Sequence, residues 1–460
     1  MIVSGFPPSV EMGAQTCWQI ARNLPGHGWT PIVLTAGERH MQYSKGTQAG
    51  FEPGFPVVRT GMLPHPLSLL RWIRAAQKRG DEAAPVEGAA RSTEVRRRGW
   101  LRRSVLASLN VPDTVTGWIL PAIVAGRRLI RGSDIACLFS SGPAWSGHLA
   151  GLALARLTGL PWVVHFRDPW SQGSAESGGP RWADRINARL ERTVVRRATT
   201  VICVTEQHSN LLRRHYASCS PDKFVTIPNG YDGVEWERAE RDGVSGSGTE
   251  AGRFVITYAG ALYMGRTPLL VLEALRRLGQ AGDLSLDRVR LDLVLYDGVR
   301  QLPDGRDMME VAREMGLGGS LQMLGPLARD ETLRRLLDSD LLLLLGHNFT
   351  IQVPGKLYEY LRSGRPILAL APVGAQTELL QATGGAWIVE PDDVDGAVQA
   401  IRDAYQRWLA GKPGPQADAR LVSGFDRRVL VGRLAGELAA AVSQAAARRR
   451  PPQRAILGQK

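Results

Sequence analysis

The sequence predicts an α/β protein made of two doubly wound, Rossmann-like domains. Short apolar runs alternate with amphipathic stretches through most of the chain. The apolar runs lack internal polar alternation, which is typical of parallel strands that are covered on both faces. This pattern occurs in two successive series, and 460 residues suffice for two domains of roughly 100–200 residues each.

The first series gives an N-terminal domain over residues 1–235. Its helices are expected at 13–24 and 182–197, where apolar residues recur at helical spacing. Its strands are expected at 2–6, 31–35, 134–140, 162–166, 200–205 and 223–228. The segment 80–104 departs from this pattern, and its arginines favour either a membrane-surface segment or a solvated insertion. These arginines are Arg96, Arg97, Arg98, Arg102 and Arg103.

The second series gives a C-terminal domain over residues 253–425. Its strands are expected at 254–260, 290–296, 320–325, 340–346, 366–370 and 386–390, with helices between them. The polar, Gly- and Ser-rich segment 235–252 is the expected linker between the domains. A helix over 426–447 should follow, and the basic tail 448–460 is expected to be disordered.

The formal net charge of +13 lies mainly in the first half of the chain and in the tail. A basic surface favours phosphate-bearing partners such as anionic lipid or a lipid-linked pyrophosphate. We expect no nucleic-acid partner, because the sequence contains no recognition motif for one.

The four cysteines form no C-x-x-C pair and no His stands at metal-ligand spacing from them, so buried, reduced thiols are expected. The sequence shows no signal peptide and no apolar run of the ~18–20 residues that a spanning helix needs. We therefore expect a cytoplasmic protein, with a peripheral place on the inner face of the plasma membrane as a further expectation.

Open parallel sheets bind ligands beyond the carboxyl ends of their strands, so the turns after the strands are candidate sites. In the first domain Gly13 opens a helix after the first predicted strand. His165, Arg167 and Asp168 cluster where the 162–166 strand ends. Neither G-x-G-x-x-G nor G-x-x-x-x-G-K-[ST] occurs in the first of these turns, which argues against NAD enzymes and P-loop ATPases.

In the second domain Gly260 ends a strand, and Arg266 opens the following helix. A second helix starts at Pro354 and Gly355, and it places Lys356 in its first turn with Glu359 three residues later. A cation near a helix N-terminus is locally unfavourable, so Lys356 indicates an anionic ligand close by.

Seven segments taken in order resemble the retaining family-4 glycosyltransferases of the GT-B fold, of the bacterial polysaccharide and glycolipid type. The likeness extends over about 2–440. The segments are GFPP…GAQTCWQIARNLPGHGWTPIVLT, PWVVHFRDPW, RLERTVVRRATTVICVTEQ, FVTIPNGYD, ITYAGALYMGRTPLLVLEAL, VPGKLYEYLRSGRPILAL and GGAWIVEPDD. The resemblance implies two domains that face each other across a cleft.

The resemblance also implies roles for the candidate residues. It places Arg266 and Lys356 on the diphosphate of a nucleotide-sugar donor, and Glu359 on the ribose hydroxyls. The remaining residues expected near the donor or the acceptor are Gly13, Asn229, Gly260, Pro354, Gly355, and the catalytic candidates His165, Arg167 and Asp168. Gly230 stands beside Asn229 in the loop between the domains.

Three positions depart from the family pattern. Ala261 replaces a common basic residue, Ile351 replaces a glutamate that contacts the donor sugar, and His165 replaces a frequent aspartate. These changes leave the donor sugar open and keep a degenerate nucleotide-sugar-binding protein as an alternative. A GT-B-fold sugar-nucleotide epimerase is the other alternative.

The implied reaction transfers a sugar from a UDP- or GDP-sugar to a saccharide or polyprenyl-linked acceptor, with retention of configuration. The leaving phosphate would itself assist the acceptor hydroxyl, so we expect neither a metal nor a separate cofactor. Synthesis of cell-surface polysaccharide or glycolipid is the expected setting.

Overall fold

In the computed structural model, the described residues are 1–38, 53–64, 111–172, 181–241, 252–262, 266–296, 298, 300–302, 304–346 and 350–449. The predicted basic insertion 80–104, with its five arginines, and the tail from 450 onward lie outside these residues. The chain divides into two compact units. Unit 1 comprises Met1–Ile227 together with the segment from Val431, and unit 2 comprises Pro228–Leu430.

Unit 1 contains parallel strands, most of which are buried. β1 (Val33–Ala36) pairs with β2 (Val57–Thr60). A four-stranded sheet follows in the order β3 (Leu138–Gly142), β4 (Trp162–Phe166), β5 (Thr200–Cys203) and β6 (Phe224–Thr226). Ile2 bridges to Leu34 of β1 and to Ser140 of β3, so it joins the two sets of strands.

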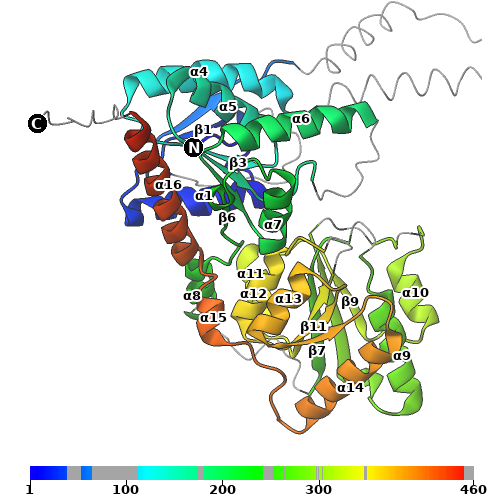
Figure 1. The fold of residues 1–460 in the computed structure, drawn as a ribbon. Coiled ribbons are helices and arrows are strands. Elements are labelled where there is room, and N and C mark those ends of the chain that lie inside the picture. Colours follow the sequence, from blue (N-terminus) through cyan, green and yellow to red (C-terminus); the bar gives the residue numbers. More distant parts are fainter. Residues whose placement is uncertain are drawn as a thin grey trace, which may run out of the picture. The chain divides into compact units, whose positions relative to one another are not determined.

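The helices of unit 1 cover this sheet (Figure 1). They are α1 (Met12–Asn23), α4 (Ile119–Gly132), α5 (Ser146–Thr158), α6 (Arg181–Arg197) and α7 (Glu206–His215). Short 3-10 turns occupy Leu24–His27, Thr116–Trp118 and Pro221–Lys223. The core gathers large apolar side chains from both layers, including Trp118, Trp162 and Phe224. Burial of such side chains stabilises each one by about 1.5–3 kcal/mol relative to exposure.

The predicted helices at 13–24 and 182–197 and most predicted strands of this unit are confirmed within a few residues. The strand predicted at 2–6 is wrong, because only Ile2 pairs there and the chain reaches Pro7 and Pro8, which have no amide hydrogen to donate. β2 was not predicted. It is a short, half-buried edge strand, and such a strand leaves little hydrophobic pattern in the sequence.

Unit 2 holds a six-stranded, wholly parallel sheet in the order β12-β11-β10-β7-β8-β9. The strands are β7 (Phe254–Gly260), β8 (Val289–Leu295), β9 (Leu321–Leu324), β10 (Leu341–Leu345), β11 (Ile367–Leu370) and β12 (Ala386–Val389). All six were predicted. β7, β8, β10 and β11 are almost wholly buried, and buried strands of leucine, valine and isoleucine give the clearest pattern in a sequence. The edge strands β9 and β12 are only partly buried.

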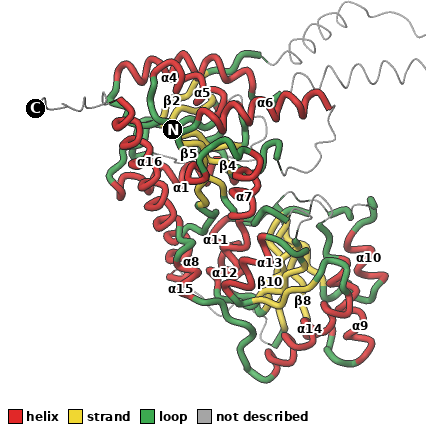
Figure 2. The backbone as a smooth tube through the Cα atoms, viewed as in Figure 1, coloured by secondary structure: helices red, strands yellow, loops and turns green. Residues whose placement is uncertain are grey.

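Helices lie on both sides of this sheet, as Figure 2 shows. They are α8 (Gly233–Arg241), α9 (Leu269–Ala281), α10 (Met308–Glu314), α11 (Arg329–Leu337), α12 (Gly355–Ser363), α13 (Ala375–Thr383), α14 (Val394–Leu409) and α15 (Ala419–Ser423), with a 3-10 turn at Leu286–Arg288. Each unit is therefore a layered α/β structure of the predicted class.

The strand order of unit 2 reverses between β7 and β10. From β7 the chain proceeds to β8 and β9 on one side, and it then returns to β10, β11 and β12 on the other side. In open parallel sheets, the carboxyl ends of the two strands at such a reversal are the usual place for a ligand. The topology thus directs attention to the loops after β7 and β10.

The predicted linker is partly helical, because α8 runs through its first residues. Trp236 and Ala239 of α8 are buried in unit 2, which explains why this charged segment folds. Residues 242–251 lie outside the described part of the chain.

α16 (Arg427–Arg449) confirms the predicted C-terminal helix. Its residues from Val431 are grouped with unit 1, and Leu434 and Leu438 are almost fully buried. By length and composition alone, Arg427–Arg448 is long and apolar enough to cross a membrane, contrary to the expectation from the sequence that no such segment exists. A helix that packs against a protein core has the same character, so this is weak evidence for a membrane span.

Candidate active site

The candidate site of unit 2 lies where β7 and β10 end. β10 pairs with β7, so the loops that follow these two strands start side by side. α12 follows the β10 loop and is fixed to β7 through Tyr360, whose hydroxyl accepts a hydrogen bond from the Ala259 amide at 2.9 Å. The N-terminus of α12 is thereby held at the carboxyl end of β7.

Lys356 lies in the first turn of α12, as predicted, with Pro354 as N-cap and Gly355 as first helical residue. Its Nζ is inaccessible to solvent, and it has no hydrogen-bond partner among the described residues. It lies 4.0 Å from the centre of the Tyr258 ring, a cation–π contact. A Cβ on Gly260 would overlap this Nζ, so the position of the Lys356 side chain depends on glycine at the end of β7.

Positive charge is concentrated at this point. Burial, and then the charge of Arg266, lower the pKa of Lys356 well below its ordinary value, while Glu359 acts in the opposite direction. The helix N-terminus adds its own partial positive charge. A buried ammonium group, a guanidinium group and a helix N-terminus together form a site that an anion would stabilise.

Glu359 is held by an arginine that the sequence analysis did not single out. Arg329, at the start of α11, donates to Glu359 at 2.5 Å and to Glu235 of α8 at 2.9 Å. Burial alone would lower the pKa of Arg329, but the two carboxylates outweigh it and raise that pKa. No spacing rule links these three residues, because they come from three separate helices, so only the fold reveals the cluster.

Tyr296 follows β8 and lies close to the same cluster. Burial, and then the charge of Glu359, raise the pKa of its hydroxyl to about 12. Tyr296 as a whole residue is 40% exposed.

Ala261 stands where the family pattern has a basic side chain, and it contributes a backbone contact in place of a side-chain contact. Its carbonyl accepts a hydrogen bond from the Tyr258 hydroxyl at 2.8 Å. This bond orients the ring on which Lys356 rests. The basic residue expected here is absent, and the cations that act on one another at this point are Lys356 and Arg266.

In unit 1 the structure brings Gly13 and Arg167 together. Gly13 lies in the first turn of α1, and a Cβ there would overlap the guanidinium group of Arg167. Arg167 also donates to the carbonyl of Pro143, in the turn after β3. Gly13, Arg167 and Pro143 therefore lie together at the carboxyl ends of the strands, and the roles of Gly13 and Arg167 toward a ligand remain predictions.

His165 and Asp168 have different surroundings. His165 is buried within β4, and its Nδ1 lies 3.1 Å from the Ser141 hydroxyl of β3. Asp168 is half-buried beyond the strand end. The catalytic roles of His165, Arg167 and Asp168 remain predictions.

Buried groups that the sequence analysis passed over support the loop that starts at Arg167. Glu191 of α6 accepts hydrogen bonds from the amide of Ser171 at 2.5 Å and from the hydroxyl of Tyr216 at 2.7 Å. Trp170 stacks on Trp145, with ring centres 5.0 Å apart. Glu191 lies one helical turn before the apolar Val194 and Val195, and a carboxylate on that apolar side was the signal that could have identified this support.

Asn229 and Gly230 lie at the start of unit 2. A Cβ on Gly230 would overlap the carbonyl of Phe425, and that close approach requires glycine. The carbonyl of Gly230 accepts a hydrogen bond from Arg427 at 3.1 Å. The role of Asn229 toward a donor remains a prediction.

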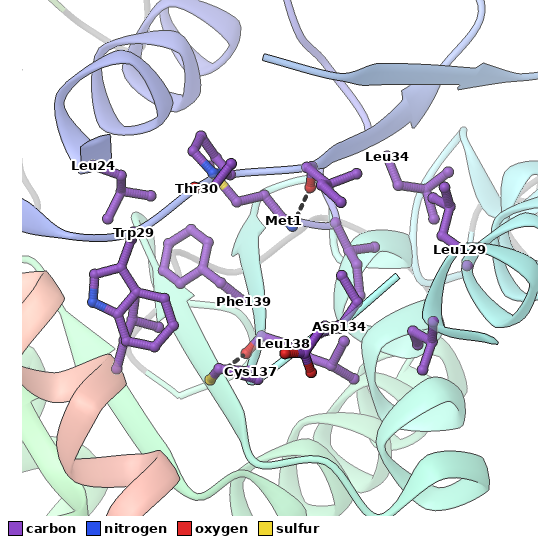
Figure 3. A pocket seen from close by; sticks show the side chains of 18 of the residues that line it. Met1, Leu24, Trp29, Thr30, Leu34, Leu129, Asp134, Cys137, Leu138 and Phe139 are labelled. Carbon is purple, nitrogen blue, oxygen red and sulfur yellow. Dashed lines mark hydrogen bonds between the residues drawn. The ribbon is translucent and has the colours of Figure 1, made fainter. Parts of the chain in front are cut away.

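A separate apolar pocket of about 450 Å³ lies in unit 1 (Figure 3). Leu34, Leu129, Leu138 and Phe139 are among its lining residues. It reaches residues before β1 and β3, such as Thr30 and Asp134, so it sits at the amino ends of these strands, away from Arg167. Within the described residues, no group of three or more His, Cys, Asp or Glu side chains could hold a metal ion.

Comparison with known families identifies the N-terminal part of the chain. Residues 13–230 match the glycosyl transferase 4-like domain. This part of the chain therefore carries a glycosyl transferase 4-like domain. This match begins at Gly13 and ends at Gly230, so it covers Arg167 and Asp168 as well.

A curated relative is the alpha-maltose-1-phosphate synthase of Mycolicibacterium smegmatis, which is 24% identical over 207 residues. The match spans 43% of this chain and 53% of the relative, about half the relative's length. What that enzyme makes therefore carries no conclusion for the whole of this protein.

Two solved structures share the fold. The sucrose-phosphate synthase of Thermosynechococcus elongatus aligns with a TM-score of 0.56 at 14% identity, over 97% of this chain and 96% of its own. Anabaena HepE in complex with UDP aligns with a TM-score of 0.51 at 14% identity, over 97% and 99%. At this identity the likeness shows the GT-B fold alone, and it confirms the predicted fold class.

Proposed function

We propose that this protein transfers a sugar from a nucleotide-diphosphate donor to a saccharide or lipid-linked acceptor. The observation that carries the proposal is the buried, unbonded ammonium group of Lys356 beside Arg266 at the N-terminus of α12. The match of residues 13–230 to the glycosyl transferase 4-like domain and the UDP bound to the structural relative HepE support the same choice of ligand. A donor diphosphate would supply the missing negative charge.

The chemistry follows from the charge that develops in the reaction. As the bond between the anomeric carbon and the diphosphate breaks, negative charge grows on the leaving group. Lys356, Arg266 and the α12 amides would stabilise that charge, and removal of one such preorganised donor typically costs about 10²–10³ in rate. We further propose retention of configuration without a metal, with the leaving phosphate accepting the proton of the acceptor hydroxyl.

The donor nucleoside would be recognised next to the diphosphate. Glu359 would accept hydrogen bonds from the ribose hydroxyls, since its Oε2 makes no hydrogen bond to the described residues while Oε1 is held by Arg329. UDP- and GDP-sugars are the proposed donors. Ile351, which stands where the family pattern has a glutamate, leaves the donor sugar unassigned.

The acceptor side is proposed to lie in unit 1, near Gly13, Arg167 and Asp168. A polyprenyl-linked saccharide at the inner face of the plasma membrane would match the basic character of the N-terminal half of the chain. A role in cell-surface polysaccharide or glycolipid synthesis, by a cytoplasmic or peripheral protein, follows as part of this proposal.

A thermal-shift panel of UDP-, GDP- and dTDP-sugars tests the donor site, because a ligand that binds only the folded state raises Tm. We expect one nucleotide series to raise Tm in the wild type and to have no effect on Lys356→Met. Turnover assays with and without acceptor follow: transfer supports the proposal, whereas acceptor-free conversion of the donor sugar indicates an epimerase. Nucleotide binding with no turnover would favour a degenerate binding protein.

A further inference from the structure

The outer face of α6 carries a row of arginines. At 100° per residue, Arg181, Arg185, Arg189, Arg192 and Arg196 fall within an arc of about 80° on the helical wheel. All five residues are exposed, and none of them has an ion pair or side-chain hydrogen bond within the described residues. We call this set the arginine stripe.

Acidic side chains are kept off the stripe. α6 contains two acidic residues, of which Glu191 is buried in unit 1 and Asp184 lies outside the arc. Like charges one turn apart destabilise a helix by about 0.2–0.5 kcal/mol per pair, so the stripe has no structural advantage for α6 itself. A negatively charged partner would remove that repulsion.

The neighbouring helices extend the basic surface and add apolar side chains to it. α5 contacts both α6 and α4, and the three helices lie side by side in unit 1 (Figure 1). On α4, Leu120 is 58% exposed and Val124 is 44% exposed. Three arginines share that exposed side of the helix: Arg127, Arg128 and Arg131.

α5 and α6 also carry exposed aliphatic side chains on the same basic surface. Leu157 of α5 is 57% exposed beside the exposed Arg156, and Ile186 of α6 is 37% exposed, about 60° beyond the edge of the stripe on the helical wheel. Each of the three helices buries its opposite side in the core of unit 1. Arginines and exposed aliphatic side chains therefore share the outer side of this helix layer.

We propose that the outer face of α4, α5 and α6 binds the surface of an anionic phospholipid membrane. Arginines attract the phosphate headgroups, and aliphatic side chains between them can enter the boundary of the acyl chains. A nucleic acid would use the arginines but would leave Leu120, Val124 and Leu157 without a partner. This proposal does not depend on the donor site of unit 2.

The test is co-sedimentation of the protein with vesicles of phosphatidylcholine, with and without phosphatidylglycerol. We expect binding only to the anionic vesicles, and weaker binding at high salt. The stripe variant changes Arg181, Arg185, Arg189 and Arg192 to glutamine. Each arginine near the surface contributes about fivefold to the partition coefficient, so the variant should bind at least tenfold more weakly.

A matched control removes the same charge from exposed arginines of unit 2, changing Arg300, Arg313, Arg407 and Arg420 to glutamine. It should bind vesicles as the wild type does, and circular dichroism should show that both variants are folded. A third variant, Leu120→Ser with Val124→Ser, should weaken binding to anionic vesicles at high salt. Equal binding by wild type and stripe variant, or tight binding of a duplex oligonucleotide without vesicle binding, would overturn the proposal.

Discussion

Lys356 sits in an environment that opposes its charge. Its Nζ is buried, Arg266 lies nearby, and the N-terminus of α12 adds a partial positive charge. A protein selected only for stability would place a neutral side chain here. Functional sites often keep groups that lower the stability of the protein without its ligand, and the bound ligand offsets that loss.

Replacement of Lys356 by methionine should raise Tm at neutral pH while abolishing nucleotide binding. Because the folded-state pKa of Lys356 is lowered, the unfolded chain binds more protons between that pKa and 10.5, and the unfolding free energy of the wild type rises with pH over this range. The Tm advantage of the variant should therefore shrink as the pH is raised toward 10.5. A Tm below that of the wild type at pH 7 would contradict the assignment.

Arg329 should affect nucleotide binding only by holding Glu359 in place. Loss of its two charge-assisted hydrogen bonds, in Arg329→Ala, should weaken UDP binding by about tenfold, whereas binding of 2′,3′-dideoxy-UDP should change little. Isothermal titration of both nucleotides measures this difference, and Arg329→Lys should restore part of it. If neither nucleotide binds the wild type, the proposed donor site is wrong. If Arg329→Ala weakens the binding of both nucleotides equally, only the proposed role of Arg329 is wrong.

At the scale of elements, α12 is short and sharply bounded. Pro354 precedes it with the extended backbone of an N-cap, and Gly364 ends it in the left-handed region at φ 69°. Leu357, Tyr358 and Leu361 anchor the buried side. The position of Lys356 thus depends on where this helix starts and stops.

The end of α12 can be tested with a matched pair of glycines. Gly364→Ala should lower the unfolding free energy by about 1 kcal/mol, because a side chain at positive φ is strained. Gly436→Ala, inside α16 where a Cβ meets no atom within 4 Å, should raise it by about 0.5–1 kcal/mol. Urea unfolding measures both, and the same sign for the two variants would contradict the local account.

At the scale of the whole molecule, the chain returns to its first unit at the end. α16 carries residues from Val431 back to unit 1, where Arg433 donates to the carbonyl of Thr226 at 2.7 Å and Leu434 is buried. The last helix is therefore part of the core of unit 1, although unit 2 separates it from the rest of that unit in sequence.

Truncation of a buried side chain on α16 should accordingly destabilise unit 1. Leu434→Ala should cost about 2–5 kcal/mol of unfolding free energy, whereas Val429→Ala, at a position that is 50% exposed, should cost much less. In calorimetry, Leu434→Ala should lower the Tm of the unfolding transition of unit 1, whereas Gly364→Ala should lower the Tm of the transition of unit 2. A shift of the same transition would show that the two units unfold together.

The sequence alone determined the two α/β series, nearly all buried strands, the limits of α12 and the cation at its first turn. Each of these follows from local patterns: unbroken apolar runs, helical spacing, and proline or glycine at helix ends. The short edge strand β2 and the helix α8 were missed, because the edge strand is half-buried and the charged helix looked like a linker.

Only the tertiary structure decided which distant groups meet. Strand order brought the β7 turn and the N-terminus of α12 together, and three helices placed Arg329 between Glu235 and Glu359. The burial that makes Lys356 an unsatisfied cation likewise comes from packing against Tyr258. A sequence records which residues can form each element, but a site of this kind depends on which elements become neighbours in space.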